Sequence, residues 1–159
     1  MDILVGVDGS ASSEKALAWA LEDARARGNA TVIVVHAYRR PEQRSSPYAY
    51  SYPYLPGHLV QQLSESERAW RDEQAALARR QGEAVIDHAV RSAQTDVGDV
   101  PIKRVVVASE AAKTLIEMSP TADLLVVGSR GRGGFRGLRL GSVSQQCLHH
   151  ARCPVVVVR

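Results

Sequence analysis

The stretch TVIVVHA, residues 31–37, consists almost entirely of β-branched and other apolar residues. An apolar run of this length without alternation is typical of a strand buried on both faces, which favours a parallel sheet. Four further apolar runs read as strands, at residues 3–8, 102–108, 123–128 and 154–158. The five runs alternate with helix-like segments, so we predict an α/β fold with a five-stranded parallel sheet and helices on both faces.

The segments between the predicted strands carry helix signals. Apolar residues at three- and four-residue intervals predict a helix in SSEKALAWALEDARARG, residues 12–28. Ser12 or Ser13 is expected to cap this helix, and Gly28 to end it. The other predicted helices cover residues 58–93, as one helix or two consecutive ones, residues 110–119, and a segment from about Ser142.

The whole chain of 159 residues suits a single domain, residues 1–159, with a long loop at residues 38–57 that holds four prolines and all five tyrosines. Its net charge of +3 is too small to imply a nucleic-acid partner. No apolar run is long enough to cross a membrane and the amino terminus lacks signal-peptide features, so we expect no membrane partner and a cytoplasmic location. Cys147 and Cys153 form no CxxC motif, which indicates reduced thiols or, as the alternative, a redox-responsive pair.

The stretch VVGSRGRGGFRGLRLGSVSQQ, residues 126–146, joins a predicted strand to a predicted helix. In parallel sheets, ligands bind at the carboxyl ends of the strands, and Asp8 and Gly128 both follow strands at that edge. Glycine at 128 and 131 lets the chain turn sharply and lets backbone amides approach a ligand. The helix that begins at Gly141 offers unpaired N–H groups and serine hydroxyls to a phosphate. A mobile linker and an RNA-binding arginine tract are the alternatives for this loop.

The spacing Gly128, two residues, Gly131, nine residues, Gly141-Ser142 resembles the ATP-binding branch of the universal stress protein family, the UspA-like domain. The terminal stretches ILVGVDGS and CPVVVV and the strand end VVHA resemble the same family, so the similarity covers nearly the whole chain. The resemblance implies a Rossmann-like fold of the adenine nucleotide alpha hydrolase-like type, with strand order 3-2-1-4-5. It also implies ATP, with Mg²⁺ or Mn²⁺ bound through its phosphates, and a homodimer through the C-terminal strand 154–158.

The same resemblance assigns residues to the adenine nucleotide. It places Asp8 near the ribose or base. The adenine side would be lined by Gly6, Val7 and Ala37. The ribose and phosphates would be bordered by Val127, Gly128, Arg130 and Gly131. The phosphate tail would be received by Gly141, Ser142, Val143 and Ser144. Neither a catalytic residue nor a protein-built metal site is predicted.

These features predict an ATP-binding regulatory module of the stress response with at most slow ATP hydrolysis, because no Walker A lysine or kinase-type glycine loop is present. A nucleotide-using transferase or adenylating enzyme on the same fold is one alternative, and a protein-interaction domain that binds no nucleotide is another. The turn after the third strand reads Ala108-Ser109-Glu110-Ala111, where relatives often have Gly-x-Pro-Ala.

Overall fold

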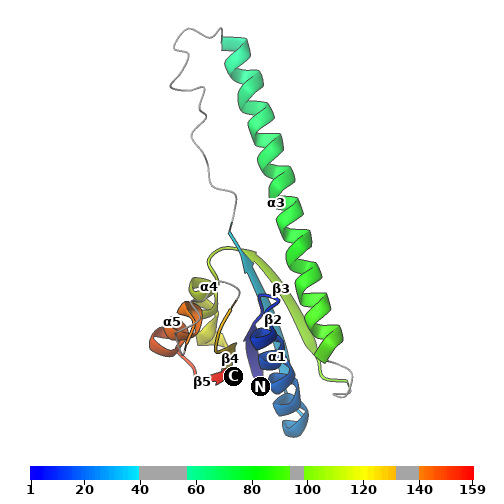
Figure 1. Cartoon of the computed structure of the whole chain (residues 1–159), viewed down its shortest axis with the longest axis vertical. Helices are drawn as coiled ribbons and strands as arrows, with labels where there is room; N and C mark the ends of the chain where they lie inside the picture. The colour runs from blue at the N-terminus through cyan, green and yellow to red at the C-terminus, as the bar shows by residue number, and fades with distance from the viewer. Residues whose placement is uncertain (40–56, 94–98, 132–139) are drawn as a thin grey trace.

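A computed structural model describes residues 1–39, 57–93, 99–131 and 140–159 of the chain. Its centre is a five-stranded, all-parallel sheet with the strand order β3-β2-β1-β4-β5 (Figure 1). The strands are β1 (Asp2–Gly6), β2 (Thr31–Tyr38), β3 (Ile102–Ala108), β4 (Leu124–Gly128) and β5 (Val155–Val158). The predicted α/β fold and its strand order, 3-2-1-4-5 in chain order, are therefore confirmed.

Helices cover both faces of this sheet. They are α1 (Ala11–Arg27), α3 (Gly57–Ala93), α4 (Ala111–Met118) and α5 (Ser142–His150), and a 3-10 turn, η2 (Ser119–Thr121), follows α4. On one face, Val5 and Val34 of the sheet pack with Leu17 of α1 and Ile86 of α3. On the other face, Leu4, Val35 and Leu125 pack with Leu115 of α4 and Cys147 of α5. Strand residues alternate between the two clusters because successive side chains point to opposite faces.

The first helix begins two or three residues earlier than the sequence predicted. Ser10, rather than Ser12 or Ser13, is its N-cap: the Ser10 side chain accepts a hydrogen bond from the Ser13 N–H. Gly28 ends the helix in the left-handed conformation with a φ of 69°, as expected for a glycine C-cap. The cap at Ser10 brings the side chains of Ser10 and Ser13 within hydrogen-bond distance of Asp8.

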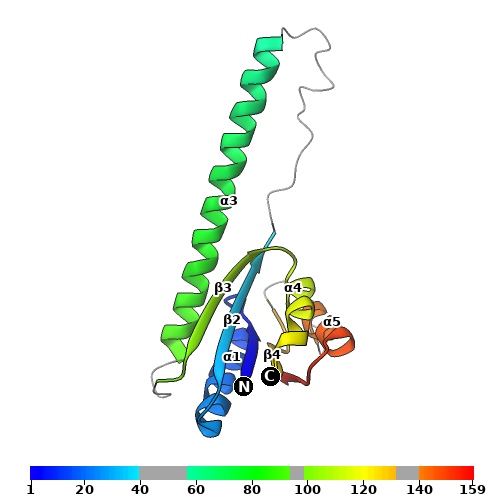
Figure 2. The same cartoon turned by 180° about the vertical axis from the view of Figure 1, so that it is seen from behind.

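Residues 57–93 form one continuous helix rather than two. Only its carboxyl-terminal part packs on the sheet, through Ile86, Ala89 and Val90, and its amino-terminal part extends past the strands (Figures 1 and 2). Trp70 and Leu77, near the middle of this helix, are exposed. The predicted loop at 38–57 is shorter than expected, because Tyr38 belongs to β2 and Gly57 begins α3; residues 40–56 lie outside the described part of the chain.

The order of the strands creates a switch point beside β1. The chain adds β2 and β3 on one side of β1 and then returns to place β4 on the other side. Gly6 pairs with Val35 of β2 and Val5 pairs with Val126 of β4, so these three strands end at the same edge. In open α/β sheets, ligands bind outside the carboxyl ends of the strands at such a point. Among the described residues, no helix combines the length and hydropathy of a membrane span.

Candidate functional site

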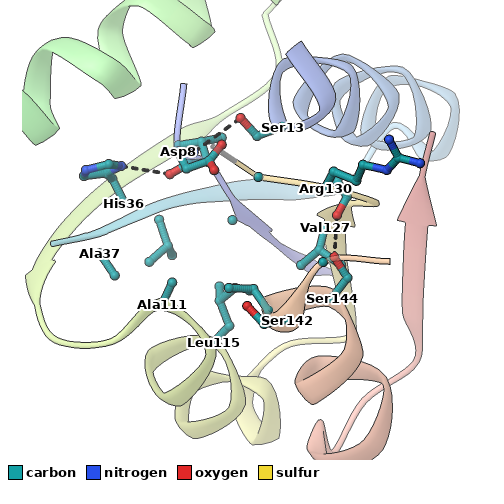
Figure 3. Close-up of a pocket in the computed structure, with 17 residues that line it drawn as sticks. Asp8, Ser13, His36, Ala37, Ala111, Leu115, Val127, Arg130, Ser142 and Ser144 are labelled. Atoms are coloured by element: carbon teal, nitrogen blue, oxygen red, sulfur yellow. Dashed lines mark hydrogen bonds between the residues drawn. The ribbon is translucent and has the colours of Figure 1, made fainter. Parts of the chain in front are cut away.

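A cavity of about 350 Å³ opens at the carboxyl edge of the sheet, at the switch point between β1 and β4. All twelve residues that the sequence assigned to a nucleotide line it (Figure 3). They are Gly6, Val7, Asp8, Ala37, Val127, Gly128, Arg130, Gly131, Gly141, Ser142, Val143 and Ser144. The structure adds five lining residues that sequence reasoning missed: Ser13, Val35, His36, Ala111 and Leu115. The volume lies in the range of small-molecule sites in proteins.

One end of the cavity is apolar. Ala37 at the end of β2 and Ala111 and Leu115 of α4 line it, and Figure 3 shows these three on the same side of the cavity. A Cβ at Gly6 would come within 2.8 Å of Leu115 Cδ1, so glycine at this position lets α4 lie close over the end of β1. At this end of the cavity, a flat aromatic ring of a ligand would contact small aliphatic side chains.

The turn after β3 borders this apolar end. Glu110, which stands at the N-cap of α4, makes no side-chain cap bond there. Its carboxylate instead lies 3.5 Å from the Arg39 guanidinium, in an ion pair that is largely exposed on both sides. Exposed pairs of this kind contribute little to stability. Ala111, the first residue of α4, lines the cavity directly after this turn.

Asp8 lies next to the first turn of α1, where serine side chains hold it. Its Oδ1 accepts hydrogen bonds from the Ser10 hydroxyl at 2.6 Å and from the Ser10 N–H at 3.0 Å. Its own N–H donates to Ser13 Oγ over 3.3 Å. The carboxylate is thus held in one orientation at the cavity edge, where it can accept hydrogen bonds from a ligand hydroxyl.

Gly128, the last residue of β4, and Gly131 are required for space rather than for a left-handed backbone conformation. Within the described residues, only Gly9 and Gly28 have positive φ, so Gly128 and Gly131 do not adopt the left-handed conformation that favours glycine. A Cβ at Gly128 would lie 2.7 Å from main-chain atoms of Ser12. A Cβ at Gly131 would lie 2.5 Å from Asp8 Oδ2. The loop therefore passes close against both α1 and the Asp8 carboxylate.

The base of the glycine loop is closed by hydrogen bonds inside the protein. The Gly141 N–H donates to the Ser129 carbonyl at 2.7 Å, and the Ser144 hydroxyl donates to the Gly128 carbonyl at 2.7 Å. The sequence expected the hydroxyls of Ser142 and Ser144 to be donors to a phosphate. That of Ser144 is instead buried and used within the protein. Residues 132–139, which include the glycines and most arginines of the loop tip, lie outside the described residues.

The first turn of α5 supplies the remaining donors. Its N-cap, Gly141, carries no side-chain cap, and the first helical bond runs from the Gln145 N–H to the Gly141 carbonyl at 3.0 Å. The N–H groups of the first turn, Ser142 to Ser144, have no partner within the helix, as at every helix start. Together with the Ser142 hydroxyl and the helix dipole, they favour an anion. Arg130 lines the same side, but its guanidinium points away from Ala37 and Ala111 (Figure 3).

His36 is the most informative of the residues that the sequence did not assign. Its Nδ1 donates to the Val7 carbonyl at 2.8 Å, which links the ends of β1 and β2 below the cavity. Its ring also packs on α3, where a Cβ at Gly82 would come within 2.8 Å of it. The strand end VVHA could have indicated His36 as a lining residue, since a histidine that follows four apolar strand residues lies near the edge of the sheet where ligands bind.

The two cysteines do not line the cavity: Cys147 is buried on α5, and Cys153 follows that helix. Both are free thiols. Burial, with a smaller effect of the neighbouring Cys153, raises the pKa of the Cys147 thiol from 9.0 to about 11. Burial also raises the pKa of Cys153, and the charge of Asp123 adds to it. Thiols with raised pKa values are unreactive at neutral pH, so the expectation of reduced thiols accords with their surroundings.

The fold and the cavity define a class: a Rossmann-like α/β protein with a small-molecule cavity at its switch point. The sequence model of the universal stress protein family matches residues 1–159, and the chain belongs to that family. Over 157 residues it is 40% identical to universal stress protein Rv2005c of Mycobacterium tuberculosis, a match that covers 99% of this chain. The chain spans 45% of the length of that relative.

Solved structures of the same family share the fold. UspA from Lactobacillus plantarum superposes with a TM-score of 0.69 at 23% identity, covering 100% of this chain and 97% of that one. A universal stress protein in complex with cAMP gives a TM-score of 0.63 at 24% identity, covering 100% and 96%. A family protein from Arabidopsis thaliana with AMP bound gives 0.55 at 18% identity, covering 99% and 90%.

Proposed function

We propose that this chain is an ATP-binding regulatory module that contributes to the stress response. One observation carries the proposal: the twelve residues that the sequence assigned to a nucleotide line one cavity at the switch point. The cavity has an apolar end at Ala37 and Ala111, a carboxylate at Asp8 and a helix amino terminus at Ser142. This order matches the base, the ribose and the phosphates of a nucleotide. Family members solved with cAMP and with AMP support an adenine nucleotide.

The phosphate tail would lie against the amino terminus of α5. The N–H groups of Ser142, Val143 and Ser144 and the Ser142 hydroxyl would provide donors for it, and Gly131 and Gly141 border the same cavity without side chains. Mg²⁺ or Mn²⁺ would be held through the phosphates, because the described residues include no group of three metal-ligating side chains. The cation would neutralise phosphate charge there. No group of this chain is required as a catalytic base, and hydrolysis should be slow.

The test is calorimetric titration of the purified protein with ATP, ADP, AMP and GTP. We expect ATP to bind with micromolar or better affinity and GTP at least tenfold more weakly, since the side chains that the structure describes at the apolar end, Ala37, Ala111 and Leu115, cannot hydrogen-bond the extra polar groups of guanine. The control is Trp70→Ala, which changes an exposed side chain of α3 outside the cavity. Failure of every nucleotide to bind to folded protein would favour a protein-interaction domain instead.

We also propose a homodimer formed by β5. This strand is at the edge of the sheet, next to β4 only. The carbonyls of Pro154 and Val158 accept hydrogen bonds from Leu125 and Ser129, so the main-chain groups of alternate residues face β4. The intervening residues, Val155 and Val157, therefore direct their N–H and C=O groups outward. An apolar edge strand with outward main-chain donors is a template for pairing with a second copy.

Proline substitution tests the dimer at a position chosen from this alternation. Val157→Pro removes an outward N–H and should shift the protein toward monomer with its circular dichroism retained. Val156→Pro is the contrasting variant, since it removes a bond to β4 and should destabilise the fold itself. Sedimentation that finds the same dimer for Val157→Pro and wild type would rule out the β5 interface.

The cytoplasmic location remains a prediction of the sequence.

A further inference from the structure

The first turn of α1 connects two segments of the cavity wall that are about 120 residues apart in the sequence. Ser10 is at the centre of this connection, although it does not itself line the cavity. Its hydroxyl donates to Asp8 Oδ1 at 2.6 Å, and its oxygen lies 3.4 Å from the Arg130 carbonyl on the glycine loop. The same oxygen accepts the Ser13 N–H at 3.2 Å, which caps the helix. One side chain thus contacts the Asp8 turn, the helix start and the glycine loop.

The bond from Ser10 to Asp8 determines where the carboxylate lies. A hydroxyl–carboxylate distance of 2.6 Å is in the range of charge-assisted bonds, which are the stronger class. The Ser10 N–H adds a second bond to the same oxygen at 3.0 Å. With Oδ1 held from the α1 side, Oδ2 is directed toward Gly131, where only a glycine leaves room for it. Ser10 and Gly131 therefore set the orientation of the Asp8 carboxylate, and neither offers a side chain to a ligand.

We propose that Ser10 is a positioning residue for nucleotide binding: its hydroxyl fixes the Asp8 carboxylate in the orientation that accepts the ribose hydroxyls. The proposal rests on the proposed function and adds to it the residue that sets ribose selectivity. The helix cap explains a serine at this position only in part, because aspartate or asparagine caps a helix equally well. The carboxylate of an aspartate at position 10 would be an acceptor only and could not donate to Asp8.

The test compares ATP with 2′,3′-dideoxy-ATP, which lacks the hydroxyls that Asp8 would bind, by calorimetry on the full chain. Wild type should prefer ATP. Ser10→Gly removes the hydroxyl but keeps a residue that is tolerated at helix N-caps, and it should weaken ATP about 5- to 20-fold while leaving the dideoxy analogue within about twofold. Ser10→Thr keeps the hydroxyl and should restore the preference.

A matched control separates positioning from stability. Ser119 is a buried serine outside the cavity whose hydroxyl donates to Ile116 and accepts the Arg152 N–H, both at 2.8 Å. Ser119→Ala should lower the melting temperature and leave the ATP preference as in wild type. An equal loss of both nucleotides in Ser10→Gly, or a wild type that binds both equally well, would overturn the role of Ser10. A wild type that binds neither nucleotide would instead refute the proposed function, and the role of Ser10 with it.

Discussion

Replacing Gly131 with alanine should weaken ATP binding through Asp8, although the new methyl group need not touch the nucleotide. The added Cβ would lie 2.5 Å from Asp8 Oδ2, whereas ordinary van der Waals contact begins at 3.4 Å, so the carboxylate must retreat by about 0.9 Å. The 2.6 Å bond to Ser10 does not tolerate a shift of that size: along the bond it would either lengthen the contact to about 3.5 Å, beyond a hydroxyl–carboxylate hydrogen bond, or close it into a clash, so Asp8 must leave its present orientation. The backbone at position 131 is not strained by alanine, because its φ is not positive.

The magnitude follows from the bonds that depend on the carboxylate. Hydrogen bonds to charged groups contribute about 1.5–3 kcal/mol each, and the displaced Asp8 would lose most of its bonds to the ribose. ATP affinity should therefore fall about 10- to 100-fold in Gly131→Ala. Gly28→Ala is the control, since it strains a left-handed helix end far from the cavity, with nothing within 4 Å of the new Cβ, and should reduce stability without changing affinity.

A double-mutant cycle measured by calorimetry identifies the route of the effect. If Gly131→Ala acts by moving Asp8, then the same substitution should cost less than about threefold in a protein that already carries Asp8→Ala. The expected coupling is thus nearly the whole effect of the single substitution. Losses that multiply independently in the double variant would refute the reasoning, because they would mean that position 131 acts on the nucleotide directly.

The remaining predictions concern stability. Gly128→Ala should lower the free energy of unfolding, measured by urea denaturation, by about 2 kcal/mol or more, because the new Cβ would clash with main-chain atoms of Ser12. Gly141→Ala should be nearly neutral, because its Cβ would make only contacts of 3.4 Å and longer. Equal losses of stability in the two variants would contradict this steric ranking. The raised pKa of Cys147 stabilises the fold fully below pH 9, and this part is lost as the pH rises from 9 to about 11, because the unfolded chain loses the thiol proton first. Between pH 8 and 11, the free energy of unfolding of Cys147→Ala should therefore fall by about 2 kcal/mol less than that of wild type. Identical pH profiles of unfolding free energy in the two proteins would contradict the assignment.

The strands and the ligand edge could be predicted from the sequence because they depend on local patterns. Apolar runs such as residues 31–37 have few alternatives to a buried parallel strand, and the ends of β1 and β4 bring Asp8 and Gly128 to one edge as soon as the strands are ordered. The family resemblance added the roles of individual residues. All twelve assigned residues consequently meet in one cavity.

The parts that could not be predicted depend on tertiary contacts. Leu115 has the spacing of an ordinary core residue, and only the crossing of α4 over Gly6 brings it to the cavity. The sequence predicted Ser12 or Ser13 as the cap of α1, whereas the structure has Ser10 in that place, where it also contacts Asp8. The reason for glycine at 131 is likewise the presence of Asp8, which is more than a hundred residues away in the sequence.

The central claim, that this chain binds an adenine nucleotide, is tested most directly by identifying what the purified protein carries. The protein is desalted extensively and denatured, and the released small molecules are identified and quantified against protein by mass spectrometry. We predict that wild type releases an adenine nucleotide, chiefly ATP, and that Gly131→Ala releases less of it. Release of no nucleotide from folded protein that also fails to bind added ATP would contradict it.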